Sequence, residues 1–208
     1  SYRLFVETNQ IQPYIKALLE GIDSNSTNQL EDISKQIGQL FHNGKMPQEV
    51  SVAIKTAYAG LGNVSVAVRS SATAEDLPDA SFAGQQDTYL NIQGENEILE
   101  AVKRCWASLW TARAIAYRIK NNIKQELVAL AVVIQKLAFS DASGVMFTIN
   151  PMNGRRNEMI INAAWGLGEA VVSSLVTPDT IVTDKSTTRI VSYEVANKEI
   201  MTARTLDG

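Results

Sequence analysis

The stretch that most constrains this chain runs from Val66 to Ile92. It opens as an apolar, branched run typical of a buried strand and delivers Arg69 and two serines at its end. A polar loop, a small-residue segment centred on Gly84 and a second strand over Thr88–Ile92 follow. An arginine at a strand end beside a glycine loop suits a phosphorylated ligand. The guanidinium offers a fixed fork of donors, and glycine lets backbone N–H groups approach an anion closely.

Arg69 is the leading candidate for a binding side chain in this stretch. The alternative is that Arg69 pairs with Glu75 or Asp76 and only holds the loop. Gly84 alone is a weak signal, but its position after Arg69 and four residues before Thr88 strengthens it. The Thr88 hydroxyl could donate to a phosphate, although a strand threonine often only packs. The pattern therefore predicts an anion site built around Arg69.

The composition limits the function classes that remain. With 208 residues, 45% hydrophobic and 20% charged, the chain is long enough to bury a core and is typical of a globular protein. A net charge of −3 argues against a general nucleic-acid binder. Cys105 is the single cysteine, so a reducing compartment is expected. No signal-peptide pattern and no apolar run of the ~18 residues that a membrane span needs is present. We expect a cytoplasmic protein without a membrane partner.

Two regions are predicted along the chain. Residues 1–60 show helical periodicity, and residues 61–208 are expected to form an α+β core. One long helix is expected over residues 94–117, where the spacing of the tryptophans favours core packing over a binding site. His42, the sole histidine, is expected on the surface near a helix C-terminus.

The second half of the chain is predicted to be rich in strands. Residues 128–137 form an almost continuous apolar run that leaves the core at Gln135, Lys136 and Leu137. Adenine-binding hinges leave a strand in this way, with backbone N–H and C=O groups free to read a purine edge. Residues 144–150 are predicted to pair with this strand as an antiparallel hairpin. Further strands are expected near residues 158–163, 178–184 and 188–195.

Several common catalytic patterns are absent from the sequence. There is no Walker A lysine motif, no His/Cys metal constellation and no supported Ser–His pair. The glycines of Trp165-Gly166-Leu167-Gly168-Glu169 lack the third glycine of a dinucleotide-binding loop, and a tight turn before a helix explains them.

Residues 66–91 closely resemble the ATP-binding domain of the phosphoenolpyruvate synthase and pyruvate phosphate dikinase family. The run over residues 68–86 is long and unusual, so the match is specific. The resemblance covers most of the chain, is weakest over the first 60 residues, and is shared by rifampin phosphotransferases. Further matching segments are residues 105–110, 113–114, 135–137, 143–148, 165–169 and 176–179.

The resemblance implies an α+β fold of the ATP-grasp type, in which the nucleotide lies between two lobes. It implies that Arg69 holds the ATP phosphates and has the catalytic role. Gly84 and Thr88 would belong to a loop over the phosphates, and Gln135 to Leu137 would face the adenine. In such enzymes ATP phosphorylates a histidine on a separate swivelling domain and leaves as AMP and phosphate. The phosphohistidine then delivers the phosphoryl group to pyruvate, or to an antibiotic, at a third, acceptor-binding domain.

Departures from the family pattern predict a piece truncated at both ends. The family's Gly-Gly-Lys-Gly stretch, its terminal Gln-x-Arg-Pro strand and its phosphohistidine motif are absent. The Mg²⁺ ligands of the full-length enzyme are expected in the C-terminal part that this chain lacks, so no metal ligand is assigned here. The piece alone is expected to bind ATP weakly and to turn over nothing. Two alternatives stay open: an antibiotic phosphotransferase, and a non-catalytic nucleotide-binding regulatory module.

Overall fold

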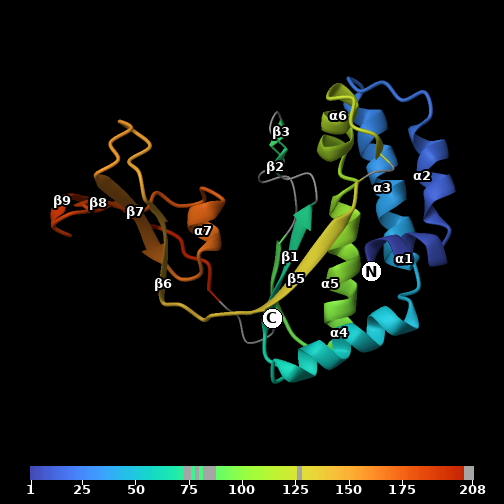
Figure 1. The fold of residues 1–208 in the computed structure, drawn as a ribbon, viewed down its shortest axis with the longest axis horizontal. Helices are drawn as coiled ribbons and strands as arrows, with labels where there is room; N and C mark the ends of the chain where they lie inside the picture. Colours follow the sequence, from blue (N-terminus) through green and yellow to red (C-terminus); the bar gives the residue numbers. More distant parts are fainter. Residues whose placement is uncertain (73–75, 78–79, 82–87, 126–127, 204–208) are drawn as a thin grey trace. The chain divides into compact units, whose positions relative to one another are not determined.

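The computed structural model describes residues 1–72, 76–77, 80–81, 88–125 and 128–203, and its chain divides into two compact units. Unit 1 comprises Ser1–Leu137 and unit 2 comprises Ala138–Gly208. Helices and sheets occur in both units (Figure 1), so the mixed α+β class is confirmed. In the described ranges, no helix combines the length and the apolarity that crossing a membrane requires.

The helical expectation for the start of the chain is confirmed. Unit 1 opens with α1 (Tyr2–Thr8), α2 (Ile11–Leu19), α3 (Thr27–Asn43) and α4 (Gln48–Gly60). The single long helix predicted over residues 94–117 is wrong, because the chain forms α5 (Glu95–Ser108) and α6 (Ala112–Lys120) instead. A turn separates them, and the Thr111 hydroxyl accepts the Ala114 N–H at 3.3 Å, which starts a new helix.

The sheet of unit 1 has three antiparallel strands in the order β4-β1-β5. They are β1 (Val66–Ala72), β4 (Thr88–Ile92) and β5 (Leu130–Lys136), and the two-residue strands β2 (Asp76–Leu77) and β3 (Ala80–Ser81) pair separately. Helix α5 packs along this sheet (Figure 1), against the side that carries Val66 and Val68. One face of the sheet is therefore closed by the core.

The tryptophans of α5 and its following turn lie in this core, as predicted. Trp106 and Trp110 are each 1% exposed, and Trp106 contacts the rings of Tyr2 and Phe5. The indole N–H of Trp110 donates to the Tyr2 hydroxyl at 3.0 Å. Burial raises the pKa of Tyr2 to about 12, because water no longer stabilises its ionised form. These aromatic contacts fix α1 to α5.

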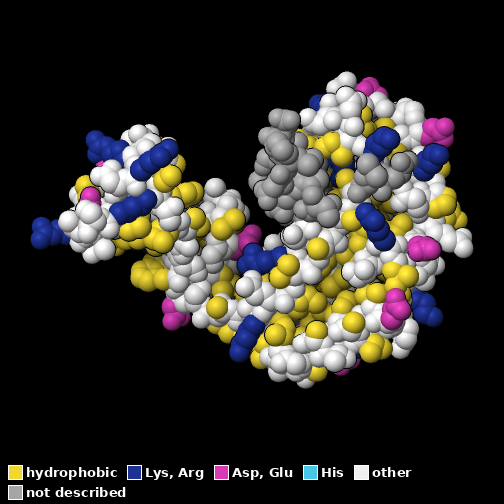
Figure 2. All heavy atoms as spheres, in the orientation of Figure 1, with side chains coloured by type: hydrophobic (Ala, Val, Ile, Leu, Met, Phe, Trp, Pro, Cys, Tyr) yellow, Lys and Arg dark blue, Asp and Glu magenta, His cyan; other side chains and the backbone are white. Residues whose placement is uncertain are grey.

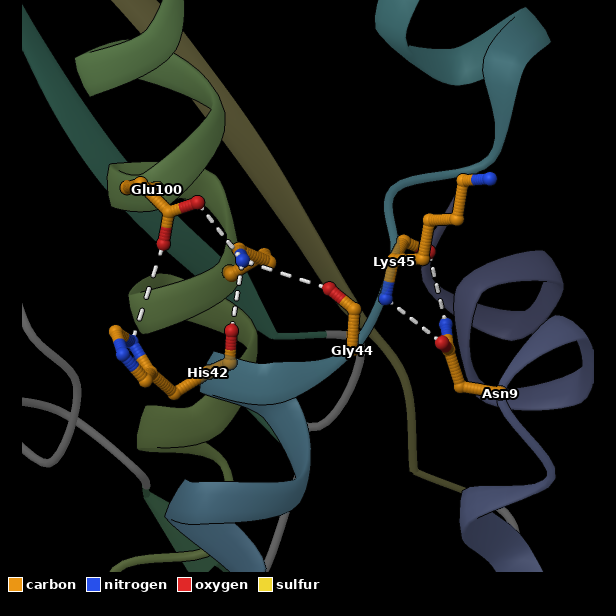
Figure 3. A network of polar contacts seen from close by, with 6 residues as sticks. Asn9, His42, Gly44, Lys45 and Glu100 are labelled. Carbon is orange, nitrogen blue, oxygen red and sulfur yellow. Dashed lines mark hydrogen bonds and ion pairs between the residues drawn. The ribbon is translucent and has the colours of Figure 1, made fainter.

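The C-terminal end of α3 is fastened by a side chain of α5 (Figure 3). The Lys103 ammonium donates to the carbonyl of His42 at 2.8 Å and to that of Gly44 at 3.4 Å, and it pairs with Glu100 at 2.8 Å. The nearby Asn9 side chain exchanges hydrogen bonds with the Lys45 backbone. The His42 side chain itself is 73% exposed, as expected for a surface histidine at a helix end. This network serves as a helix C-cap.

Unit 2 is a four-stranded antiparallel meander in the order β6-β7-β8-β9. Its strands are β6 (Ala142–Phe147), β7 (Glu158–Trp165), β8 (Asp179–Asp184) and β9 (Ile190–Glu194), with the short helix α7 (Glu169–Val172). The predicted hairpin between residues 128–137 and 144–150 is wrong, because β5 pairs with β1 and β6 pairs with β7. Both runs are strands, but their partners are chosen by long-range register, which short apolar runs do not encode.

The glycine-rich turn before α7 is confirmed. Gly166 has φ +78°, and a Cβ there would collide with the carbonyl oxygen of Thr202, which bridges to it. Gly168 then begins α7 as its N-cap residue. The segment is a turn with close backbone contact, as the missing third glycine indicated.

Candidate functional site

Arg69 lies inside β1, three residues before the strand ends, and not at the strand end where the sequence placed it. Its register partners are Thr88 on β4 and Val133 on β5. Strand alternation explains its position: Val66 and Val68 face α5, so Arg69 points to the other side of the sheet. The Arg69 side chain is exposed there.

The alternation of hydrogen-bonded and non-hydrogen-bonded pairs in the sheet brings Arg69 and Thr88 close together. The Leu137 N–H donates to the Ser65 carbonyl at 3.0 Å, and the β1–β5 register runs on without a shift. Arg69 is therefore hydrogen-bonded to Val133 and forms a non-hydrogen-bonded pair with Thr88. Side chains of such pairs are the nearest neighbours on a sheet face. The predicted phosphate residues Arg69 and Thr88 thus stand side by side.

Gln135 belongs to the same face. It lies opposite Ala67, one diagonal step from Arg69, which places the two at about 7–8 Å. We call the exposed residues on this side of the sheet the Arg69 face. They are Arg69, Thr88, Ala131, Val133 and Gln135, and the half-buried Ser71 lies on the same side. The alternation along residues 131–135 is the sequence signal that predicts Val133 on the same face as Gln135, whereas no role follows from the sequence for Ser71.

The Arg69 guanidinium has neither a hydrogen bond nor an ion pair with another described side chain. No other described side chain engages the five N–H donors of this exposed guanidinium. Glu75, the Asp76 side chain and Gly84 lie outside what the structure describes. The alternative of a loop-holding ion pair with these acids therefore stays open.

The free edge of β5 offers backbone groups at Lys136. Because the Leu137 N–H bonds to Ser65, every second residue of β5, counting back from Leu137, bonds to β1 through its backbone, and Gln135 is one of them. The N–H and C=O groups of Ile134 and Lys136 point away from β1. Strand β5 has one neighbour in the described sheet, so these groups meet no other described strand. Lys136 opposes Val66, which places its side chain on the other side of the sheet from Gln135.

Arg118, which the sequence did not single out, has a structural role in the core of unit 1. Arg118 is fully buried, where its Nε donates to Gln125 at 2.6 Å and its Nη1 to the Leu109 carbonyl at 2.7 Å. Its guanidinium lies 4.9 Å from the Trp110 ring, and burial lowers its pKa to about 10. Helix α6 contains one other arginine, Arg113, which is exposed.

The possible metal ligands among the described residues do not cluster. Within the ranges that the structure describes, no three His, Cys, Asp or Glu side chains gather in a way that could hold a metal ion. Among the described residues of the Arg69 face, Arg69 is the charged one.

The mixed architecture and the exposed arginine on a sheet describe an α+β protein with a candidate anion-binding face. The chain matches the family described as pyruvate phosphate dikinase, AMP/ATP-binding domain, over residues 1–208, and it belongs to this family.

Three relatives show how much of a longer protein this family region represents. The probable phosphoenolpyruvate synthase of Methanocaldococcus jannaschii is 47% identical over 207 residues, which cover 97% of this chain and 17% of the relative. The phosphoenolpyruvate synthase of Pyrococcus furiosus is 48% identical over 204 residues, covering 95% and 25%. That of Aeropyrum pernix is 47% identical over 206 residues, covering 96% and 25%. The chain thus spans a quarter or less of these relatives.

Proposed function

We propose that this chain is the ATP-binding region of a phosphoenolpyruvate synthase-type phosphotransferase with an ATP-grasp fold. The family match and the names of the relatives support the proposal. The observation that carries it is the exposed Arg69, which no other described side chain engages, on the same sheet face as Thr88 and Gln135. The helical region 1–60 and the core 61–208 would be two parts of this one domain.

In the proposed mode, the Arg69 guanidinium contacts the phosphate oxygens of ATP. The adjacent Thr88 hydroxyl donates to the same tail, together with the loop around Gly84. A guanidinium that is positioned before the reaction stabilises charge as it builds up on the transferred phosphoryl group. The contribution of the chain is therefore positioning and charge neutralisation, and it needs no general base.

The adenine would lie at the end of β5, over residues 135–137. The outward N–H and C=O of Lys136 fit the hydrogen-bonding edge of a purine, since β1 does not engage them. Gln135 would approach the nucleotide through its side chain and Leu137 through apolar contact. Of residues 135–137, we therefore assign the backbone groups that bind the purine edge to Lys136 alone.

The rest of the reaction is assigned to the full-length protein. ATP would phosphorylate a histidine on a swivelling domain and leave as AMP and phosphate. The phosphohistidine would then transfer its phosphoryl group to pyruvate bound at an acceptor domain. Mg²⁺ would be held outside the described residues. An antibiotic as the final acceptor is the alternative within the same chemistry. A full-length sequence without a phosphohistidine domain would instead favour a regulatory nucleotide-binding module.

The test replaces Arg69 in the full-length protein and measures ATP-dependent phosphorylation of the histidine. We expect Arg69→Ala to lower the rate by about 10²–10³-fold, or about 3–4 kcal/mol, as for other lost transition-state donors. Arg69→Lys should retain part of the rate, because it keeps the charge but loses the fork. Lys120→Ala, an exposed lysine at the end of α6, is the matched control. An unchanged rate in Arg69→Ala removes this residue from the mechanism.

A second test concerns residues 1–208 alone. We expect weak ATP binding and no turnover, because the phosphohistidine and acceptor domains are absent from this chain. Isothermal titration calorimetry measures the affinity. A micromolar dissociation constant for the isolated chain would contradict this expectation.

A further inference from the structure

Exposed basic and hydrophobic side chains both occur on the surface of unit 1 (Figure 2), and on the Arg69 face they are arranged by strand. Strand β4 contributes the Thr88 hydroxyl, and β1 contributes the Arg69 guanidinium and the Ser71 hydroxyl. Strand β5 contributes the hydrocarbon side chains of Ala131 and Val133 beside them. The donors nearest to Arg69 therefore lie on β1 and β4, so a phosphate chain that binds to this face follows β1.

Ser71 is the donor on this side of the sheet that the proposed function does not use. It lies two residues beyond Arg69 on β1, and strand alternation places both side chains on the same side of the sheet. Ser71 is half-buried, and its hydroxyl has no hydrogen bond with another described residue. Such a hydroxyl can donate one hydrogen bond and accept two. Ser71 is therefore placed to contact the same ligand as Arg69.

The residue opposite Ser71 is small. Ala131 of β5 is the register partner of Ser71, and its side chain is a single methyl group. On the other side of β1, strand β4 begins at Thr88, and no described strand pairs with Ser71 there. Because the serine side chain is short, a ligand atom reaches its hydroxyl only by coming close to the sheet. The small neighbour permits this approach.

The spacing along the sheet agrees with the order of the parts of ATP. Gln135 marks the proposed base end of the nucleotide, and it pairs with Ala67 of β1. At about 3.4 Å per residue, Arg69 lies about 7 Å beyond that level and Ser71 about 14 Å beyond it. The longer distance is comparable with the length of an extended ATP, whose terminal phosphate is the part farthest from the base.

We propose that the Ser71 hydroxyl binds the terminal phosphate of ATP and that the small side chain of Ala131 keeps this position open. The inference rests on the proposed function, because it takes the base at Gln135 and the phosphate tail at Arg69. It adds a direction, since the triphosphate then runs along β1 toward the C-terminal end of that strand. Arg69 contacts ADP and ATP alike in this arrangement, whereas Ser71 contacts ATP and not nucleotides with a shorter tail.

The test compares nucleotides that differ in the length of the phosphate tail. Isothermal titration calorimetry of the full-length protein measures the affinities for AMP, ADP and ATP, with EDTA present so that no phosphoryl group is transferred. We expect Ser71→Ala to weaken ATP binding about 10-fold, because one hydrogen bond to a charged group is lost, and to leave AMP and ADP binding unchanged. Arg69→Ala should weaken the binding of both ADP and ATP. Ser71→Thr keeps a hydroxyl and suits a strand, so it should retain the affinity for ATP.

Two further variants separate the role of the hydroxyl from that of the space beside it. Ser70→Ala removes the same group from the adjacent residue, whose side chain lies on the other side of the sheet, and should leave all three affinities unchanged. Ala131→Leu fills the position opposite Ser71 and should weaken ATP binding more than AMP binding. This variant leaves Ser71 in place, so it tests the inference even if Ser71→Ala does not fold.

The outcomes distinguish this inference from the proposed function. If Arg69→Ala leaves the affinity for ATP unchanged, the proposed function and the role of Ser71 both fail. If Arg69→Ala weakens ATP binding but Ser71→Ala does not, the role of Ser71 alone is overturned. The same holds if Ser71→Ala weakens AMP binding as strongly as ATP binding, because the hydroxyl would then not contact the terminal phosphate.

Discussion

The two units are stabilised by different means. Unit 1 has an extensive core in which Tyr2, Phe5, Phe41 and Trp106 contact one another around α5. The buried cluster of unit 2 is formed by small side chains, Ala164, Ala170 and Val176. Its sheet leaves Trp165 56% and Tyr193 55% exposed. We infer that aromatic packing stabilises unit 1. Unit 2 is stabilised mainly by the backbone hydrogen bonds between its strands and by local polar contacts.

The polar contacts of unit 2 lie at its chain reversals. Between β6 and β7, the Glu158 carboxylate accepts hydrogen bonds from Asn150, Asn153 and Arg155, and these donors lower its pKa. Between β8 and β9, the Asp184 carboxylate accepts hydrogen bonds from the backbone N–H and the hydroxyl groups of Ser186 and Thr187. Each acid thus holds one turn of the meander.

The largest expected effect is in the core of unit 1. Trp106→Ala removes a ring that is 1% exposed, and we expect a loss of about 3–5 kcal/mol in the free energy of unfolding. Trp165→Ala in unit 2 should cost less than about 1 kcal/mol, because that ring is 56% exposed. Urea unfolding followed by circular dichroism measures both. Equal losses would mean that the two units do not differ in the way described.

The next effect is in the backbone of unit 2. Gly166→Ala combines a left-handed backbone, which costs about 1–2 kcal/mol, with a collision against Thr202, which adds about 1–3 kcal/mol. Gly154→Ala is the matched control, with φ +72° and open space around it, and should show only the first cost. Thermal unfolding of both variants separates strain from collision. If Gly154→Ala is as harmful as Gly166→Ala, the contact with Thr202 does not stabilise unit 2.

The smallest effect is confined to acid. Hydrogen bonds from Ser186 and Thr187 lower the pKa of Asp184 from 3.8 to about 2. Since the folded state binds this proton less readily than the unfolded state, the stabilisation is complete above about pH 4 and is lost as the pH falls toward 2. Asp184→Asn should therefore lose less stability than the wild type between pH 5 and pH 2. Urea midpoints measure this, with Glu194→Gln on β9 as the control. Parallel pH profiles of wild type and Asp184→Asn would show that this turn does not contribute.

Local patterns predicted the elements of the fold better than their connections. The strand Thr88–Ile92 was placed correctly because turn residues bound a branched run, and the core position of the tryptophans followed from helical spacing. The hairpin with β6 and the single helix over residues 94–117 were wrong. Strand partnership depends on contacts distant in sequence, and the break at Thr111 depends on one cap within a continuous helical pattern.

The candidate site shows the same limit. The sequence predicts Arg69 and Thr88 as site residues because both lie in one continuous stretch. That they share one face depends on the strand register, which cannot be predicted from this stretch alone. The direction of the Lys136 backbone could not be foreseen, because it is set by the pairing of Leu137 with Ser65 across more than seventy residues. The roles proposed for these residues toward ATP stay predictions.

The alternation of β1 has a consequence for how this protein can change. Residues of even number, Val66 and Val68, serve the core, and the odd-numbered Arg69 serves the exposed face. Deleting one residue between Val66 and Arg69 would reverse the side of the sheet on which Arg69 lies relative to Val66. The guanidinium would then point toward the aromatic core. Insertions and deletions in this strand are therefore tolerable only in pairs, because a single one would move either the valines out of the core or the guanidinium off the exposed face.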